Sequence, residues 1–306
     1  ILNVLKAEPG KSNLGRGMMI AAVFGSQCGG LSFPMSNIGN VAAITAFEKM
    51  GYSVSFMQWS VIGFPLAIIS AILTGLIVAI WCKPEPITAE QYTLLQNESK
   101  SAKVTAKEIK LFIILAIMMY FWIFTKVNMA LTGALGCVLM LLPGINITTW
   151  KDAQRQVLPD ALFLICAVTV IVNAINQEGV GRWIVDLVFK NAAAWSVIVL
   201  VIMIMLITMV IHAIIPASVA VVGVVLVVML PLAETAGFST IGTLVLIAWF
   251  GSFIPWMPTD AVFMLAYGPG YWKFSEMMKV GVFVSIMMLI TSGIWVPIIC
   301  AITGMA

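Results

Sequence analysis

The chain has 306 residues, of which 61% are hydrophobic and 9% are charged, and its formal net charge is +3. Because a soluble domain carries about 25% charged residues, this composition and a mean hydropathy of +1.07 leave little room for a water-soluble domain and indicate a multi-pass protein of the lipid bilayer. The basic residues lie in loops beside apolar segments, so we expect no nucleic-acid partner. The five cysteines occur singly without CxxC spacing, and we expect no disulfide framework, zinc site or cofactor.

Apolar segments long enough to cross a bilayer follow one another along the chain. A helix rises about 1.5 Å per residue, so about 20 apolar residues cross a hydrocarbon core of about 30 Å. The polar stretch 86–107 predicts a helix at the membrane surface. By the length criterion we expect a helical hairpin at 193–233, two longer segments at 17–49 and 239–271, and single crossings at 54–82, 109–125, 127–143, 159–176 and 275–304.

Each of the two longer segments has 33 residues, which is too many for one straight crossing. Each contains an interruption of helix-breaking and polar residues, at 26–40 in the first and at 254–260 in the second. Non-helical backbone survives at membrane depth only where it is buried in protein or lines a water-filled cavity. We therefore predict two broken helices whose interruptions meet near the midplane, together with the hairpin tip at 212–218.

A similar pattern accompanies both interruptions, about 220 positions apart. Phe-Gly-Ser precedes each one, and Phe56–Gly63 and Phe274–Gly281 then place a glycine seven residues after a phenylalanine. Three expected crossings separate the halves, so the second broken segment enters from the opposite face. The sequence thus predicts an all-α, polytopic, inverted-repeat transporter fold. Lysines in the loop 83–110 place that loop in the cytoplasm and the C-terminus outside.

Residues that favour helix starts end each interruption: Asn37 and Asn40 in the first, Ser218 at the hairpin tip, and Asp260 in the second. Several helix N-termini would then face one cavity, each with about half a positive charge and free N–H groups, which suits a small anion. Loop carbonyls and hydroxyls suit sodium. Asp260 is interpreted as an N-cap, a sodium ligand or the carrier of a coupling proton.

Structural roles compete with these functional ones. For His212, the only histidine, a hydrogen-bonding or capping role is the first interpretation and a proton or substrate role the second. In the first interruption, close helix packing is the alternative for three glycines, and satisfaction of backbone groups is the alternative for three serines: Gly25, Gly29, Gly30, Ser26, Ser32 and Ser36.

The stretch Tyr267–Phe274 (YGPGYWKF), followed by Met277 and Gly281, resembles the divalent anion:sodium symporter family of the ion transporter superfamily, whose members carry succinate, citrate and related dicarboxylates. The order of elements over the whole chain is similar to that family from just after its first re-entrant hairpin to its C-terminus. This resemblance and the repeat offset imply that roughly 100 residues, including that hairpin, precede Ile1.

In the family, each half has a hairpin tipped with Ser-Asn-Thr and a broken helix bearing Thr-Pro-Pro, and these elements build two sodium sites beside one carboxylate site. Here the motifs diverge: Asn37–Asn40, Pro216–Ser218 and Pro258–Asp260 stand in their places. The resemblance implies substrate binding by Ser36, Asn37, Asn40, Ser218 and Thr259, and cation binding by Ser26, Gly29, Gly30, Ser32, Ala217 and Asp260.

These observations favour a sodium-coupled symporter of small di- or tricarboxylates in a bacterial cytoplasmic membrane, working by an elevator movement against a scaffold that forms a homodimer. The alternatives are a dicarboxylate exchanger, proton coupling, a passive anion channel and an intramembrane enzyme; the last lacks a nucleophile–base constellation. The expected divisions are 1–53 and 193–271 in the transport domain, and 54–108 (with the cytoplasmic surface helix), 109–192 and 272–306 in the scaffold.

Overall fold

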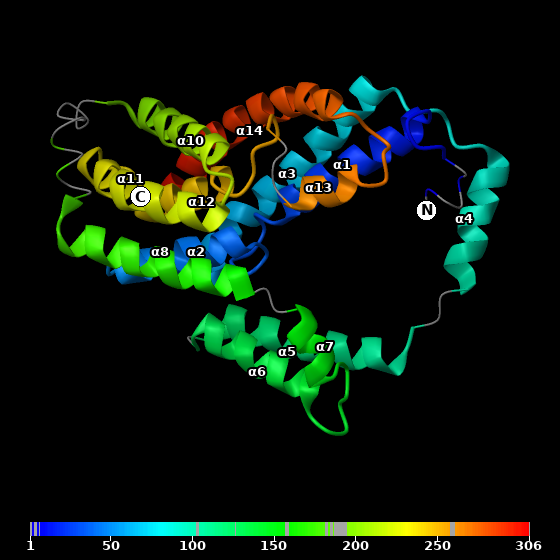
Figure 1. Cartoon of the computed structure of the whole chain (residues 1–306). Helices are drawn as coiled ribbons and strands as arrows, with labels where there is room; N and C mark the ends of the chain where they lie inside the picture. Colours follow the sequence, from blue (N-terminus) through cyan, green and yellow to red (C-terminus); the bar gives the residue numbers. More distant parts are fainter. Residues whose placement is uncertain are drawn as a thin grey trace. The chain divides into compact units, whose positions relative to one another are not determined.

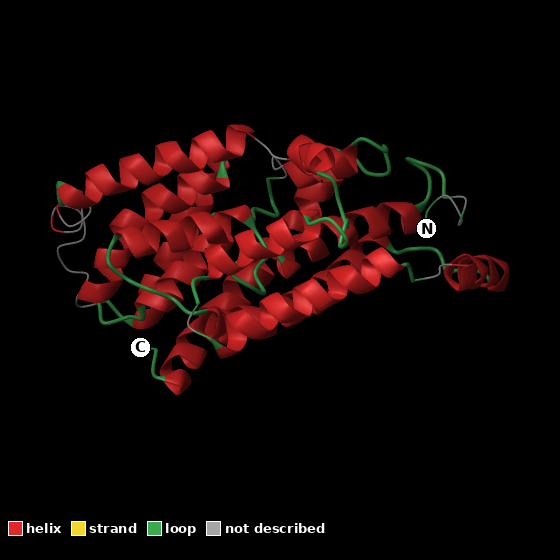
Figure 2. Cartoon of the chain, turned by 90° about the horizontal axis from the view of Figure 1, so that it is seen from below, coloured by secondary structure: helices red, strands yellow, loops and turns green. Residues whose placement is uncertain are grey.

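The computed structural model describes residues 2, 5, 7–101, 104–125, 127–156, 159–180, 183, 186, 195–257 and 261–305. Within these residues the only regular secondary structure is helix, so the predicted all-α fold is confirmed (Figure 2). The helices are α1 (Asn13–Gly29), α2 (Ile38–Lys49), α3 (Phe56–Cys82), α4 (Ala89–Ser101), α5 (Ala106–Phe124), α6 (Met129–Leu141), α7 (Trp150–Gln156), α8 (Pro159–Gln177), α10 (Val197–Ile214), α11 (Ser218–Thr235), α12 (Thr240–Phe250), α13 (Ala261–Tyr267) and α14 (Phe274–Thr303).

Four helices of the described part are long and apolar enough to cross a membrane, namely α3, α10, α11 and α14. They correspond to two predicted crossings, 54–82 and 275–304, and to the predicted hairpin. The helix expected at 127–143 is shorter than predicted, because Asn128 caps its start and Pro143 follows its end. With 13 residues, α6 extends only about 20 Å.

Residues 87–163 belong to a smaller compact unit that contains α4 to α7. Here α4 occupies the polar stretch in which a surface helix was expected. The helices α5 and α6 pack closely at Gly136, where a methyl group would lie 2.2 Å from the sulfur of Met118. Most of their other apolar side chains are exposed. In a membrane protein such faces contact lipid or another protein.

The larger unit, Lys6–Pro86 and Leu164–Ala306, is built around α12. This helix packs against α2, α3, α10, α11 and α14, and Figure 1 shows it beside α10 and α11. Every residue from Ile241 to Phe250 is buried, which explains why all of them except Thr243 are apolar or glycine, since a helix covered on all sides needs no polar face. Its 11 residues extend about 16 Å, so α12 ends about halfway through a bilayer core.

Both predicted broken helices are present in this unit. The first break separates the end of α1 at Gly29 from the start of α2 at Ile38, and the second separates the end of α12 at Phe250 from the start of α13 at Ala261. The first break is shorter than the expected interruption, because α1 continues through Ser26 to Gly29. The helices α10 and α11 form the predicted hairpin.

One end of the larger unit gathers the start of α1, the end of α3 and the start of α14. The Arg16 guanidinium forms an ion pair with Glu276 at 2.7 Å, and it also donates to Asn13 Oδ1 at 2.7 Å and to the carbonyl oxygen of Cys82 at 3.5 Å. Just beyond α3, the Glu85 carboxylate accepts hydrogen bonds from the first N–H groups of α1. We call this the Arg16 end.

The opposite end gathers the turn between α2 and α3 with the end of α11 and the start of α12. The Tyr52 hydroxyl donates to the Glu234 carboxylate, and the Ser239 hydroxyl donates to the carbonyl oxygen of Met305 beyond α14. The first broken helix therefore starts at the Arg16 end, and the second starts at the opposite end. The two broken helices run in opposite directions, as an inverted repeat requires.

Candidate functional site

The first break ends in a capped helix start. Asn37 is the N-cap of α2, and its side-chain oxygen accepts a hydrogen bond from the N–H of Gly39 at 2.8 Å. The other N–H groups of the first turn have no acceptor within the helix, and the helix dipole adds partial positive charge there. The expected N-cap role of Asn37 is confirmed.

Asn40 does not cap α2, and the prediction that it starts the helix is wrong. It lies inside α2 and is 1% exposed. Its Nδ2 donates to the carbonyl oxygens of Gly30 at 2.8 Å and of Phe33 at 3.1 Å. The first bond satisfies the carbonyl of the residue that caps the end of α1, and the second adds to the bond that the Phe33 carbonyl accepts from the N–H of Ser36. Asn40 thus ties the break to the following helix.

The residues of the first break and of the last turn of α1 divide into a side that packs on α3 and an open side. Trp59 Nε1 donates to the carbonyl oxygen of Leu31 at 2.9 Å, and Ser32 is half-buried. Ser26, Gly29 and Ser36 are exposed. Among the described residues, no atom lies within 4 Å of a methyl group placed on Gly29, and the same holds for Gly25. Close packing therefore does not account for these two glycines there.

The second break meets the first at the start of α2. A methyl group on Gly39 would lie 1.9 Å from Ser252 Oγ, so only glycine allows this approach. The ring of Phe24 on α1 also packs against Phe253 in the second break and Phe263 on α13, with ring centroids 5.9 and 5.8 Å apart. The predicted convergence of the two breaks is present in the described residues.

The glycines of the repeated pattern serve the same purpose in both halves. A methyl group on Gly63 of α3 would lie 2.5 Å from the carbonyl oxygen of Leu31 in the first break. A methyl group on Gly281 of α14 would lie 1.9 Å from the carbonyl oxygen of Pro255 in the second. In each half, the helix that follows the broken helix therefore packs directly on the backbone of the break. This helix is α3 in the first half and α14 in the second.

The hairpin lies against the end of α12. Gly251 contacts α11, because a methyl group there would lie 2.7 Å from Val222 Cγ2. His212, fully buried in the last turn of α10, places Nδ1 3.3 Å from the carbonyl oxygen of Phe250. This is the hydrogen-bonding role expected first for His212. The start of α2 and the second turn of α11 thus both lie beside the residues that follow α12.

Ser218 is not the cap of α11, and that prediction is wrong. The N-cap is Ala217, whose side chain makes no capping hydrogen bond, and Ser218 is the first helical residue. The carbonyl of Ala217 instead accepts from Ala220 and Val221. The α11 start therefore keeps N–H groups that no cap side chain satisfies. Thr259 and Asp260, assigned to substrate and cation, lie outside the described residues.

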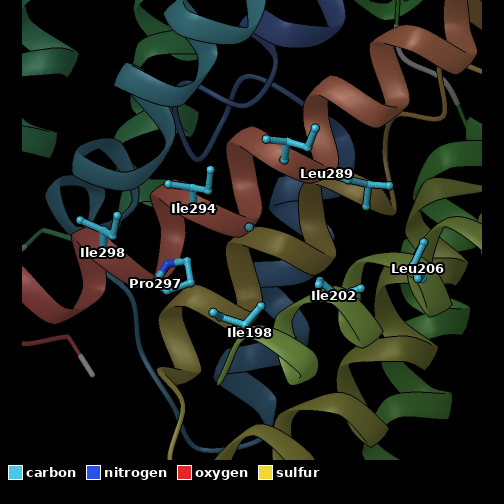
Figure 3. Close-up of a pocket in the computed structure, with 9 residues that line it drawn as sticks. Ile198, Ile202, Leu206, Leu289, Ile294, Pro297 and Ile298 are labelled. Carbon is cyan, nitrogen blue, oxygen red and sulfur yellow. The ribbon is translucent and has the colours of Figure 1, made fainter. Parts of the chain in front are cut away.

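A separate cavity of about 590 Å³ lies between α10 and α14. In Figure 3 side chains such as Ile198, Ile202 and Leu206 of α10 face Ile294 and Pro297 of α14 across it. All its lining residues are apolar or glycine, so it offers no side-chain group that could fix an anion or a cation. The polar region at the two breaks remains the better candidate site.

The sequence alone assigned no role at the site to three residues of this region, Ser252, Trp59 and Gly63. The available signal was the repeat itself: Phe-Gly-Ser precedes both breaks, yet only the serine of the first copy, Ser26, was considered. The structure buries the second serine at the meeting point and exposes the first.

Antiparallel broken helices that meet beside a helical hairpin are the architecture of a membrane transporter with inverted repeats. A comparison with protein-family models matches the sodium:sulfate symporter transmembrane region to residues 2–302. The chain therefore belongs to this family, which is part of the divalent anion:sodium symporters, and it is a multi-pass membrane protein of a transporter family. A search of the curated proteins finds no match.

Proposed function

We propose that the protein is a sodium-coupled symporter of a small multivalent oxyanion, with di- and tricarboxylates of the succinate and citrate class as its first candidate substrates and sulfate as the second. The observation that carries the proposal is the contact between Gly39 and Ser252. It brings the breaks of two antiparallel repeats together, and unwound backbone from two opposed repeats is where secondary transporters bind substrate.

The anion would bind beside the second break, near the N-terminal ends of helices. The first turn of α2 lies beside the second break, and α11 contacts that break at Val222, one turn after its uncapped start. Each helix start offers N–H groups and partial positive charge. Asn37, Ser36, Ser218 and Thr259 stay proposed substrate residues. Asn40 is proposed to act by positioning, because its amide hydrogens are bound to the chain itself.

Sodium would bind to oxygen atoms around the same breaks, since hard cations select carbonyl, hydroxyl and carboxylate ligands. The proposed ligand positions are Ser26, Gly29, Gly30 and Ser32 of the first half, and Ala217 and Asp260 of the second. The open side of α1, where Ser26 and Gly29 are exposed, leaves room for further ligands. A proton on Asp260 is the alternative coupling ion.

The moving body of an elevator mechanism would include more than the two broken helices and the hairpin. The helices α3 and α14 press onto the breaks through Gly63 and Gly281 and belong to the same compact unit. We therefore assign 54–82 and 275–304 to the transport domain, although the sequence alone suggested a scaffold role. The smaller unit, with its exposed apolar helices, is proposed as the scaffold and the homodimer contact in a bacterial cytoplasmic membrane.

The test is uptake of radiolabelled succinate, citrate and sulfate by the full-length protein in proteoliposomes, with an inward sodium gradient, with a proton gradient, or with neither. Sodium-dependent accumulation of one of these anions is expected. Counterflow in the absence of sodium and of a pH gradient would instead identify an exchanger. Flux that equilibrates without accumulating would identify a channel.

The coupling role of Asp260 is tested in the same assay. We expect Asp260→Asn to abolish or alter the cation dependence of uptake while the protein still folds, because a lone intramembrane carboxylate is costly to keep without a functional partner. The quantity to compare is the sodium and pH dependence of uptake in the wild type and the variant. If both dependences are unchanged, Asp260 carries no coupling role.

A further inference from the structure

Ser252 shares with Ser70 and Ser285 a buried hydroxyl that has no partner among the described residues, and it is the one of these three that lies where the two breaks meet. The residue is 5% exposed, and Oγ makes no hydrogen bond to any of the described residues. Its backbone is fixed, since its N–H donates to the carbonyl oxygen of Trp249 at 3.0 Å. Buried hydroxyl groups in folded proteins are nearly always satisfied, so this one calls for a ligand that completes it.

The hydroxyl is aimed at the start of α2. Oγ lies over Gly39, 1.9 Å from where a Cβ atom would be, and the Asn37 cap oxygen lies 3.3 Å from that same point. Asn37 satisfies only the N–H of Gly39, and the N–H groups of Ile38 and Asn40 belong to the first turn, which has no helical acceptors. The hydroxyl group of Ser252 and the free N–H groups at the start of α2 are therefore donors that lie close together.

The charge at this place selects the kind of ligand. The start of a helix of 12 residues carries partial positive charge and attracts anions, whereas a cation would be repelled. A serine hydroxyl can turn its hydrogen toward an acceptor, so it completes a set of donors around a single oxygen atom. The exposed Ser36 and half-buried Asn37 beside it mark the side from which a ligand arrives.

We propose that Ser252 is a substrate-binding residue whose hydroxyl donates a hydrogen bond to one oxygen of the transported oxyanion at the start of α2. This assignment rests on the proposed function and names a contact within it. Carboxylate and sulfate oxygens share the chemistry that this site recognises. One substrate oxygen then contacts the breaks of both repeats at once, which makes the Gly39–Ser252 contact part of the binding site.

The test compares Ser252→Ala with Ser285→Ala in the full-length protein. Ser285 is the matched control because it is also 5% exposed and its Oγ also has no partner among the described residues, but it lies within α14. Sodium-driven uptake of succinate and of sulfate gives KM for each anion. We expect Ser252→Ala to raise KM for the transported anion roughly tenfold or more, as loss of a hydrogen bond to a charged group does, and Ser285→Ala to leave it within about twofold.

Ser252→Cys and a thermal measurement guard against a folding defect. Cysteine places a larger but still weakly donating group at this position, so KM should rise less than in Ser252→Ala as long as Tm is unchanged. The substrate-induced rise of Tm in detergent should shrink in the same order. An unchanged KM in Ser252→Ala, or an equal rise in Ser285→Ala, overturns the assignment while leaving the transporter intact. A wild-type protein that accumulates neither anion overturns the proposed function, and this contact with it.

Discussion

The two broken helices share a sequence pattern but hold their breaks in different ways. Side chains tie the first break, because Asn40 donates to two of its carbonyls and Trp59 to a third. Close packing holds the second break, where Gly281 touches Pro255 and Gly251 touches Val222. The repeated glycine spacing therefore sets the packing geometry that the two halves share. The polar residues have diverged, so the hydrogen bonds differ between the two breaks.

The sharpest test of this comparison replaces the packing glycines. Gly281→Ala should destabilise the protein by about 3 kcal/mol and Gly63→Ala by about 1–2 kcal/mol, because overpacking against rigid backbone costs this much and the contact at Gly281 is the shorter. The measurement is Tm of the purified protein in detergent, together with the yield of monodisperse protein.

Gly75→Ala is the matched control for that series. It also lies within α3, but among the described residues no atom lies within 4 Å of its added methyl group. Alanine there should be neutral or stabilise the helix by up to about 1 kcal/mol. Equal losses at Gly63, Gly75 and Gly281 would show that the repeated glycines do not set the geometry of the breaks.

The side chains of the first break provide the second test. Asn40→Ala should cost about 1–2 kcal/mol, because the carbonyl of Gly30 loses its side-chain donor and the carbonyl of Phe33 keeps only the N–H of Ser36. Trp59→Phe keeps most of the packing and removes one bond to Leu31, so about 1 kcal/mol is expected. Tm reports both changes. If Asn40→Ala raised the KM for the substrate and left Tm unchanged, Asn40 would instead bind the substrate directly.

The smallest effect is expected at the start of the first broken helix, where Glu85 is exposed. Hydrogen bonds from the backbone N–H groups of Asn13 first, and also of Glu85 itself and Leu14, lower the pKa of the Glu85 carboxyl below its ordinary value of 4.5. A lowered folded-state pKa means that the ionised carboxylate stabilises the fold. That contribution is complete above pH 4.5 and is lost as pH falls through the folded-state pKa.

Glu85→Gln should therefore lower Tm slightly at neutral pH, and the difference from the wild type should disappear as the solution becomes more acidic than the folded-state pKa of Glu85. Melting curves of both proteins across that acidic range measure it. A difference that stays constant with pH would mean that the carboxylate charge does not support the start of α1.

Hydrophobic length and helix-breaking residues were enough to predict the architecture. The long apolar runs became α3, α14 and the hairpin, and the polar interruptions became breaks, because non-helical backbone in a membrane needs a protein or water partner. The seven-residue Phe-to-Gly spacing also located the two glycines that touch the breaks. These features depend on local composition and spacing, which a single sequence displays.

The finer roles at the site depended on contacts between distant residues, which the sequence does not display. Asn40 looked like a helix start because amide side chains favour that position, but Gly30 and Phe33 lie where its amide can reach them. Ser26 and Ser252 follow the same Phe-Gly pair, and only packing against Gly39 separates a buried serine from an exposed one. Local patterns cannot distinguish such cases.

Arg16 has a mechanical consequence. One guanidinium group contacts the first turn of α1, the last turn of α3 and the first turn of α14. A movement of one repeat at that surface is therefore transmitted to the other repeat. The charge-assisted bond between Arg16 and Glu276, at 2.7 Å, resists separation. Hinging of the repeats away from each other there would break this bond, whereas sliding of the whole bundle keeps it intact.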